Sequence, residues 1–233
     1  MTTKTVARGY SPGDKTEFGD TWRERMAAAA EDVRYLLSRG YDISAAMTFV
    51  GNRFQLSNRQ RMALTRGVTS RSQQKARREK ELSSLSGVVY VDGFNTVITL
   101  EVALSGSPLL RCDDGTIRDI AGLHGSYRIV DKTARAVELM LDELDAQGID
   151  GVIVYLDQPV SNSGRLKSLI AELGANRRYR VTAELLTDVD SELSSKPQVV
   201  TSDGVILDAC GGWYNLNRRI IEKCIPEAWI YPI

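Results

Sequence analysis

From residue 87 onward, short apolar runs alternate with longer amphipathic stretches. The apolar runs at 87–91, 151–156 and 179–186, rich in aliphatic and β-branched residues, have the length of buried strands. The stretches between them repeat apolar residues at helical spacing, as in Val137, Met140, Leu141 and Leu144. This alternation is typical of a parallel sheet with crossover helices, so we predict an α/β domain over residues 87–233.

The first 86 residues show a helical period throughout. Helices are predicted to begin at a Thr21–Glu24 capping box, at Asp42 and at a Ser57–Gln60 capping box. The polar, charged segment 68–86 is predicted to be a linker or a solvated helix. We therefore expect a small all-helical domain with its linker, residues 1–86, before the α/β domain.

Aspartates follow three of the predicted strands. Asp92 ends the run Val88–Val91, Asp157 follows 151–156, and Asp203 follows a further apolar run that begins at Pro197. Any one of them alone is most simply a turn or helix-capping residue. Because the carboxyl ends of parallel strands meet at one edge of a sheet, the three carboxylates are expected to share a cleft. Their mutual repulsion favours a bound cation, and oxygen ligands without His or Cys favour Mg²⁺ or Mn²⁺.

Composition narrows the classes of protein. Hydrophobic residues make up 42% of the chain and charged residues 26%, as in ordinary globular proteins. No apolar run reaches the length of a membrane span, and no signal peptide is evident, so we expect a cytoplasmic protein without membrane contact. Three cysteines without CxxC spacing indicate free thiols. The single histidine, His124, makes a Ser-His-Asp triad or a His-rich metal site improbable.

Charge is distributed unevenly along a chain of zero net charge. Residues 1–86 carry 16 Lys and Arg against 9 Asp and Glu, whereas residues 87–233 carry 14 against 21. Two short helices joined by a tight turn resemble a helix-turn-helix, and the second of them contains Arg59 and Arg61. A cationic helix is the electrostatic pattern expected for contact with phosphates, although such helices are often merely solvated.

Short motifs in the second half resemble those of a known family. Val91-Asp92-Gly93-Phe94-Asn95 and Val199-Val200-Thr201-Ser202-Asp203 resemble the opening and late strand motifs of the NYN branch of PIN-like nucleases. Val154-Tyr155-Leu156-Asp157 is similar to the strand between them. The resemblance covers residues 87–233, and the helical part resembles an uncharacterised domain fused ahead of such modules.

The resemblance implies a Rossmann-like, PIN-like domain that cuts RNA, or less often DNA, with Mg²⁺ or Mn²⁺. Asp92 and Asp203 would be the primary metal ligands, with Asp157 as a third. Asn95 would orient a ligand or the phosphate. Thr201 and Ser202 would support the strand end by hydrogen bonds. Asp190 would be the acid that the family places on a helix shortly before the last strand.

The segment 109–128 departs from the family pattern. Asp119 is expected to complete the acidic cluster, and Arg118 or Arg128 to hold a phosphate. The rival interpretation is a surface loop stiffened by salt bridges.

Three functions stay open from the sequence. The first is a metal-dependent nuclease, most simply a ribonuclease, whose basic helices guide the polyanion to the acids. The second is a helix-turn-helix DNA-binding protein with a non-catalytic α/β sensor domain. The third is a degenerate nuclease fold that serves as an RNA-binding scaffold. No phosphate loop or dinucleotide fingerprint is present, and a homo-oligomer is compatible with each function.

Overall fold

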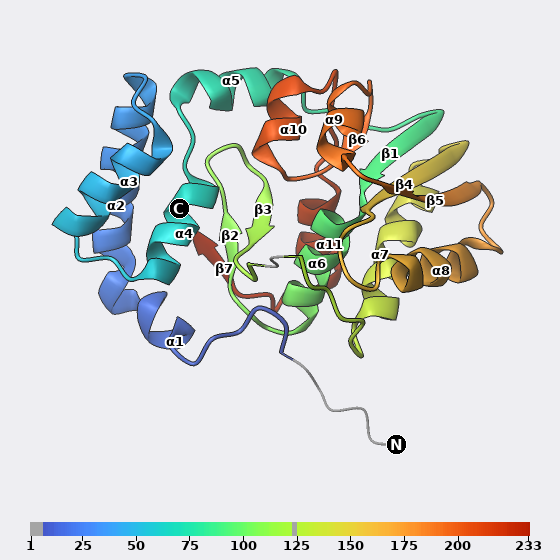
Figure 1. The fold of residues 1–233 in the computed structure, drawn as a ribbon, viewed down its shortest axis with the longest axis horizontal. Helices are drawn as coiled ribbons and strands as arrows, with labels where there is room; N and C mark the ends of the chain where they lie inside the picture. Colours follow the sequence, from blue (N-terminus) through green and yellow to red (C-terminus); the bar gives the residue numbers. More distant parts are fainter. Residues whose placement is uncertain (1–6, 123–124) are drawn as a thin grey trace.

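The computed structural model in Figure 1 describes residues 7–122 and 125–233. His124 therefore lies outside the described residues. Helices form one side of the molecule, an α/β unit forms the other, and a small sheet lies between them. The predicted fold class is confirmed, because a parallel sheet flanked by helices follows an N-terminal helical region.

The main sheet has four parallel strands in the order β5-β4-β1-β6. Alternate side chains of β1 and β4 enter two different clusters: Val89 and Val91 join one, and Tyr90 packs against the other. This period of two means that both faces of the sheet are covered. The strands are β1 (Val88–Asp92), β4 (Gly151–Asp157), β5 (Arg180–Leu186) and β6 (Val199–Val200).

Helices cover the two faces of this sheet unequally. The larger apolar cluster packs under α6 (Gly93–Leu104), α7 (Thr133–Ala146), α8 (Ser163–Gly174) and α11 (Leu216–Cys224). The smaller cluster lies under α9 (Val189–Ser194) and α10 (Gly204–Ala209). Since α9 and α10 flank β6, the chain leaves the sheet on this face next to Asp203.

The N-terminal helices share their core with the small sheet. That sheet has the order β3-β2-β7, with strands Ile117–Asp119, Leu109–Arg111 and Ile230–Pro232. Leu110, Ile120 and Tyr231 are buried in the same cluster as the apolar side chains of the helices. The helices are α1 (Asp14–Glu17), α2 (Asp20–Ser38), α3 (Ile43–Arg53), α4 (Asn58–Gly67) and α5 (Arg71–Glu79).

The helix starts predicted from capping residues are confirmed at some positions and wrong at one. The Asp42 cap and the Ser57–Gln60 capping box are confirmed. The Thr21–Glu24 box is wrong, because α2 begins at Asp20 after Gly19 without a side-chain cap. Segment 68–86 contains a helix, α5, that starts at a Ser70–Gln73 capping box. No helix among the described residues is long and apolar enough to cross a lipid bilayer.

Candidate active site

The order of the main sheet creates one place where side chains from several strands can meet. The chain moves from β1 to β4 and β5 on one side, and then returns to β6 on the other side of β1. The connections therefore diverge between β1 and β6, which is where parallel α/β sheets bind ligands. Asp92 ends β1, and Asp203 follows β6 as the cap of α10. The two acids lie at this switch point.

Asp92 is the most buried of the cleft acids, with 6% of its surface exposed. Burial raises the pKa of its carboxyl to about 7, and the negative charges of Asp203 and Asp157 act in the same direction. A hydrogen bond from Thr201 opposes this shift. A cation bound beside this carboxylate would therefore offset the cost of its burial and its repulsion by Asp203 and Asp157.

Hydrogen bonds fix the residues that surround Asp92. The Thr201 hydroxyl donates to Oδ2 of Asp92 at 2.8 Å and accepts from the Asp203 backbone N–H at 3.0 Å. Oδ1 of Asn95 accepts from both the backbone N–H and the hydroxyl of Ser202, at 3.0 and 2.7 Å. Asn95 thus binds the start of α6 to the end of β6, and its carbonyl oxygen is used within the protein.

Asp157 and Asp190 approach the same region from other elements. Asp157 ends β4 and lines the cleft with Asp92 and Asp203. The pKa of Asp157 is raised by burial and by the charge of Asp188. Asp190, exposed in the first turn of α9, has a pKa raised by partial burial and by Asp203 and Asp157. The charges of Asp157 and Asp203 therefore act on both Asp92 and Asp190.

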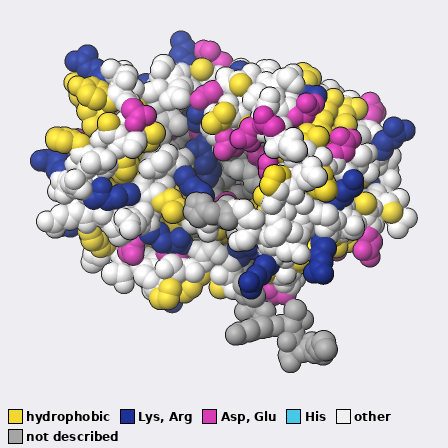
Figure 2. All heavy atoms as spheres, viewed as in Figure 1, with side chains coloured by type: hydrophobic (Ala, Val, Ile, Leu, Met, Phe, Trp, Pro, Cys, Tyr) yellow, Lys and Arg dark blue, Asp and Glu magenta, His cyan; other side chains and the backbone are white. Residues whose placement is uncertain are grey.

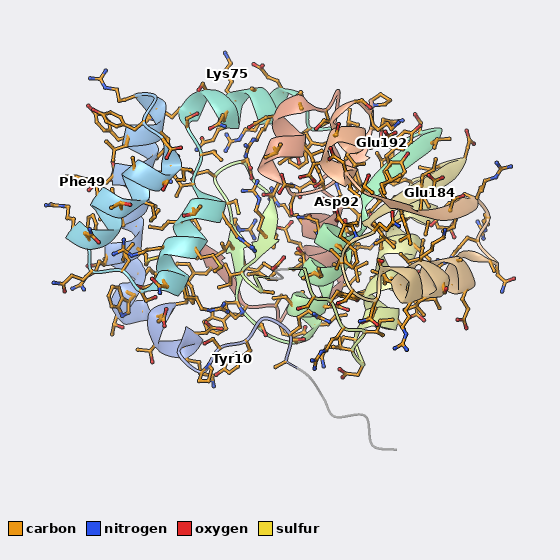
Figure 3. All side chains as sticks on the ribbon, in the orientation of Figure 1. Tyr10, Phe49, Lys75, Asp92, Glu184 and Glu192 are labelled. Carbon is orange, nitrogen blue, oxygen red and sulfur yellow. The ribbon has the colours of Figure 1, made fainter. Side chains whose placement is uncertain are left out.

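The cleft has a volume of about 830 Å³ and two chemically different walls. The α/β wall carries Asp92, Asp157 and Asp203, and the facing wall includes Tyr41 and Arg66 of the helical part. Figure 2 shows a hollow with acidic side chains gathered near α9 and α10, and basic side chains inside it near β3. Figure 3 labels Asp92 where β1 meets α6, within the α/β unit.

Arg118 lines the cleft, but its guanidinium is hydrogen-bonded to groups of the protein itself. Its guanidinium donates to the carbonyl of Ser202 and to the carboxylate of Asp114, which also receives Nη1 of Arg77 at 2.7 Å. Arg77 pairs with Asp208 of α10 as well. Burial alone would raise the pKa of Asp114, but the charge of Arg118 and its hydrogen bonds hold it below the usual value. This buried cluster fixes the strand end that carries Ser202.

Asp119 also lines the cleft, with both oxygens engaged. Its Oδ1 accepts from the Ala121 backbone at 2.8 Å and its Oδ2 from the Thr99 hydroxyl at 3.1 Å. Arg66 lies 3.5 Å from the same carboxylate. The pair of Arg118 with Asp114 is a salt bridge of the kind in the rival interpretation, but residues 109–119 form the β2–β3 hairpin rather than a surface loop.

Three arginines predicted to contact phosphate lie elsewhere. Arg59 donates to Asp14 and to the carbonyls of Gly9 and Ile120. Arg61 donates to the carbonyls of Leu56 and Met47, and Arg128 is exposed outside the cleft. The structure does not bring them to the aspartates.

Arg77 and Asp114 were missed as parts of this region. Arg77 stands in a run of cations typical of a solvated face, yet only 4% of its side chain is exposed. A signal was available in the Ser70–Gln73 capping box, which predicts a helix. Within that helix Gln73 and Arg77 are four residues apart, so they share one side, and both line the cleft.

The donor set of the cleft fits a hard divalent cation. Within residues 7–122 and 125–233, no three His, Cys, Asp or Glu side chains form a ready-made metal site. Mg²⁺ is commonly held by one or two carboxylates, while waters and substrate phosphates complete its shell. The raised pKa of Asp92 beside Asp203 is the feature that such an ion would relieve.

Comparison with known proteins gives relatives without an assigned activity. The family model "Domain of unknown function (DUF5616)" matches residues 82–219, and "Protein of unknown function (DUF434)" matches residues 25–80. The chain is 36% identical over 208 residues to "Uncharacterized protein MJ0935" of Methanocaldococcus jannaschii, covering 87% of this chain and 96% of that protein. No solved structure matches.

Proposed function

This chain belongs to the DUF5616 family, and we propose that it is a metal-dependent nuclease whose substrate is RNA. The matched span, residues 82–219, contains Asp92, Asp157 and Asp203 of the cleft, Asp190 outside its lining, and Asn95, Thr201 and Ser202. If these residues carry the activity, it belongs to the part of the chain that defines the family.

One observation carries the proposal. Asp92, Asp157 and Asp203 follow three neighbouring parallel strands and line one cleft at the switch point of the sheet. A fold gains no stability from gathering carboxylates that repel one another, and burial together with the charges of Asp203 and Asp157 raises the pKa of Asp92. Perturbed carboxyls gathered in a cleft are the usual mark of a functional site. Oxygen-only ligands at such a site favour Mg²⁺ or Mn²⁺, and RNA follows from the resemblance of residues 91–95 and 199–203 to NYN nucleases.

Each residue of the proposed site would have a separate role, which follows from its position. Asp92 and Asp203 would hold the ion, which supplies Lewis acidity toward a phosphoryl oxygen and toward water. Thr201 fixes the Asp92 carboxylate and the Asp203 backbone in one orientation through a single hydroxyl. Asp190, exposed and with a raised pKa, is suited to take a proton from an attacking water at its carboxylate.

The test is cleavage of labelled RNA by the full chain with Mg²⁺ or Mn²⁺. Asp92→Asn and Asp203→Asn should each abolish cleavage, since an amide is a poorer cation ligand than a carboxylate of the same shape. The matched control is Asp150→Asn, an exposed position at the opposite end of β4 from Asp157, which should retain full activity.

Two results would contradict the proposal. The first is a pure, folded protein that cleaves neither RNA nor DNA with either metal. The second is cleavage that Asp92→Asn and Asp150→Asn leave equally intact, which would assign the activity to another site or to a contaminant.

A further inference from the structure

A second cavity, of about 730 Å³, opens against a different face of α5 from the one that lines the cleft. Gln73 and Arg77 of α5 face the cleft, whereas other residues of the same helix line the second cavity. We call it the α5 groove. Its lining residues are Arg34 of α2, Arg71, Gln74, Lys75, Arg78 and Glu79 of α5, and Asp113 between β2 and β3.

The α5 groove is lined by a cationic stripe. Arg71, Lys75 and Arg78 stand with Gln74 at positions i, i+4, i+7 and i+3, which lie on one side of an α-helix. All three cations are exposed, and Figure 3 shows Lys75 projecting outward from α5. The stripe is therefore a continuous row of donors along the groove.

Most of this charge is uncompensated. Four cations line the groove against two carboxylates, Asp113 and Glu79. Asp113 is taken by the forked guanidinium of Arg34, at 2.8 and 2.7 Å. Lys75 lies 3.9 Å from Glu79, and both side chains are more than half exposed, so that pair is weak. Arg78 also donates to the backbone carbonyl of Asp113 at 3.4 Å, a neutral acceptor that leaves its charge uncompensated. Arg71, Lys75 and Arg78 are exposed and thus accessible to an external anion.

We propose that the α5 groove binds the phosphodiester backbone of the polynucleotide whose cleaved phosphate enters the cleft. This inference rests on the proposed function, because it takes the same polynucleotide as the ligand. A single anionic strand crossing α5 would reach both cavities, since a helix with its side chains is only about 10 Å wide. The stripe would offset the repulsion between the substrate and the cleft acids by holding phosphates beyond them.

The test measures RNA affinity of the full chain in EDTA, so that cleavage cannot interfere. The probe is a labelled single-stranded RNA of about 16 nucleotides, at the upper end of known single-strand site sizes. The variant Arg71→Gln/Lys75→Gln/Arg78→Gln keeps good helix-forming residues while removing three charges. The control, Arg23→Gln/Arg25→Gln/Arg53→Gln, removes three exposed charges from α2 and α3 away from both cavities.

The stripe variant should bind roughly ten- to a hundredfold more weakly at 0.1 M salt, and its log K against log salt slope should fall by about 2. The control should keep the slope of the original protein. In cleavage assays with Mn²⁺ the stripe variant should raise KM and leave kcat unchanged, which a general loss of structure would not do.

Equal binding by the stripe and control variants would overturn the inference, whether or not RNA is cleaved. Stripe-dependent binding without cleavage under either metal would support the groove and overturn the proposed hydrolysis. If both triple variants cleaved RNA with the same KM, the proposed hydrolysis would be supported and the role of the α5 groove would be overturned.

Discussion

At the scale of single residues, the hydroxyl of Thr201 occupies a decisive position. It donates to the buried carboxylate of Asp92 and accepts from the backbone of Asp203, so one atom joins the ends of β1 and β6. If Asp92 and Asp203 hold the proposed ion, Thr201 is a group that orients its ligands, and such groups are nearly as sensitive to substitution as the ligands themselves.

Thr201→Val should therefore weaken metal-dependent cleavage about 10–100-fold, because the isosteric side chain cannot donate to Asp92. Without that hydrogen bond the pKa of Asp92 rises further from about 7, so less of the carboxyl is ionised near neutrality. The measurement is the Mn²⁺ concentration that gives half-maximal cleavage.

Thr201→Ser keeps the hydroxyl and should act nearly as the original protein. If Val and Ser at this position gave the same half-maximal Mn²⁺ concentration, the hydroxyl would have no part in ion binding.

Sequence reasoning performed well for residues in this network. Asp92 and Asp203 were predicted to lie together because each stands at a strand end, and the structure places them at one switch point. The resemblance implied supporting hydrogen bonds from Thr201 and Ser202, and both hydroxyls donate at this place. It performed poorly for arginines. Whether a guanidinium faces solvent or a carbonyl depends on the fold around it, as Arg59 against Ile120 demonstrates.

At the scale of elements, the attachment of α5 depends on buried charge. Arg77 lies between Asp114 of the β2–β3 turn and Asp208 of α10, at 2.7 and 2.6 Å, with 4% of its side chain exposed. Removing one partner of a buried ion pair is strongly destabilising, and without Arg77 the buried Asp114 would keep Arg118 but lose half of its cationic partners. The neighbouring Arg78 is exposed and provides a natural comparison.

Arg77→Gln should lower the free energy of unfolding by about 3 kcal/mol at neutral pH, whereas Arg78→Gln should change it little. The pKa of Asp114 is depressed in the folded state, so its stabilisation is present above the unfolded value and is lost as pH falls through the folded one. The gap between the original protein and Arg77→Gln, measured by urea unfolding, should therefore narrow below about pH 4. A gap that stays constant down to pH 3 would argue against an ionic contribution from Arg77.

The element boundaries also mark where sequence signals end. The apolar run after Pro197 was expected to form a full strand, yet β6 has only two residues, Val199 and Val200. At the end of the chain, β7 is an edge strand of the small sheet, where it pairs with the distant β2. Both outcomes depend on long-range pairing, which local periodicity does not encode.

At the scale of the whole molecule, the helical part and the α/β part share a core. Leu110, Cys112, Ile120 and Tyr231 pack among the apolar residues of α2, α3 and α4. Gly67 of α4 leaves room for Ile233, because a Cβ at that position would lie 2.7 Å from its side chain. The two parts are therefore expected to depend on each other for stability.

The full chain should unfold in one cooperative transition, with calorimetric and van't Hoff enthalpies in agreement. Residues 1–86 expressed alone should lack a cooperative transition, because their apolar side chains would have no sheet to pack against. A separately folded 1–86 fragment with a sharp melting transition would contradict this expectation and would favour the helix-turn-helix hypothesis.

The shared core has a consequence for how the chain folds during synthesis. Domains commonly fold from the N-terminus as they leave the ribosome. Here the strand that completes the sheet beneath α2–α4 is β7, made long after the helices, and Phe18 of the helical part meets the Tyr231 ring with centroids 5.2 Å apart. The nascent helices must therefore wait with their apolar faces uncovered until β7 emerges. During that interval their exposed apolar surface is expected to be prone to aggregation, which is the situation that chaperones counter.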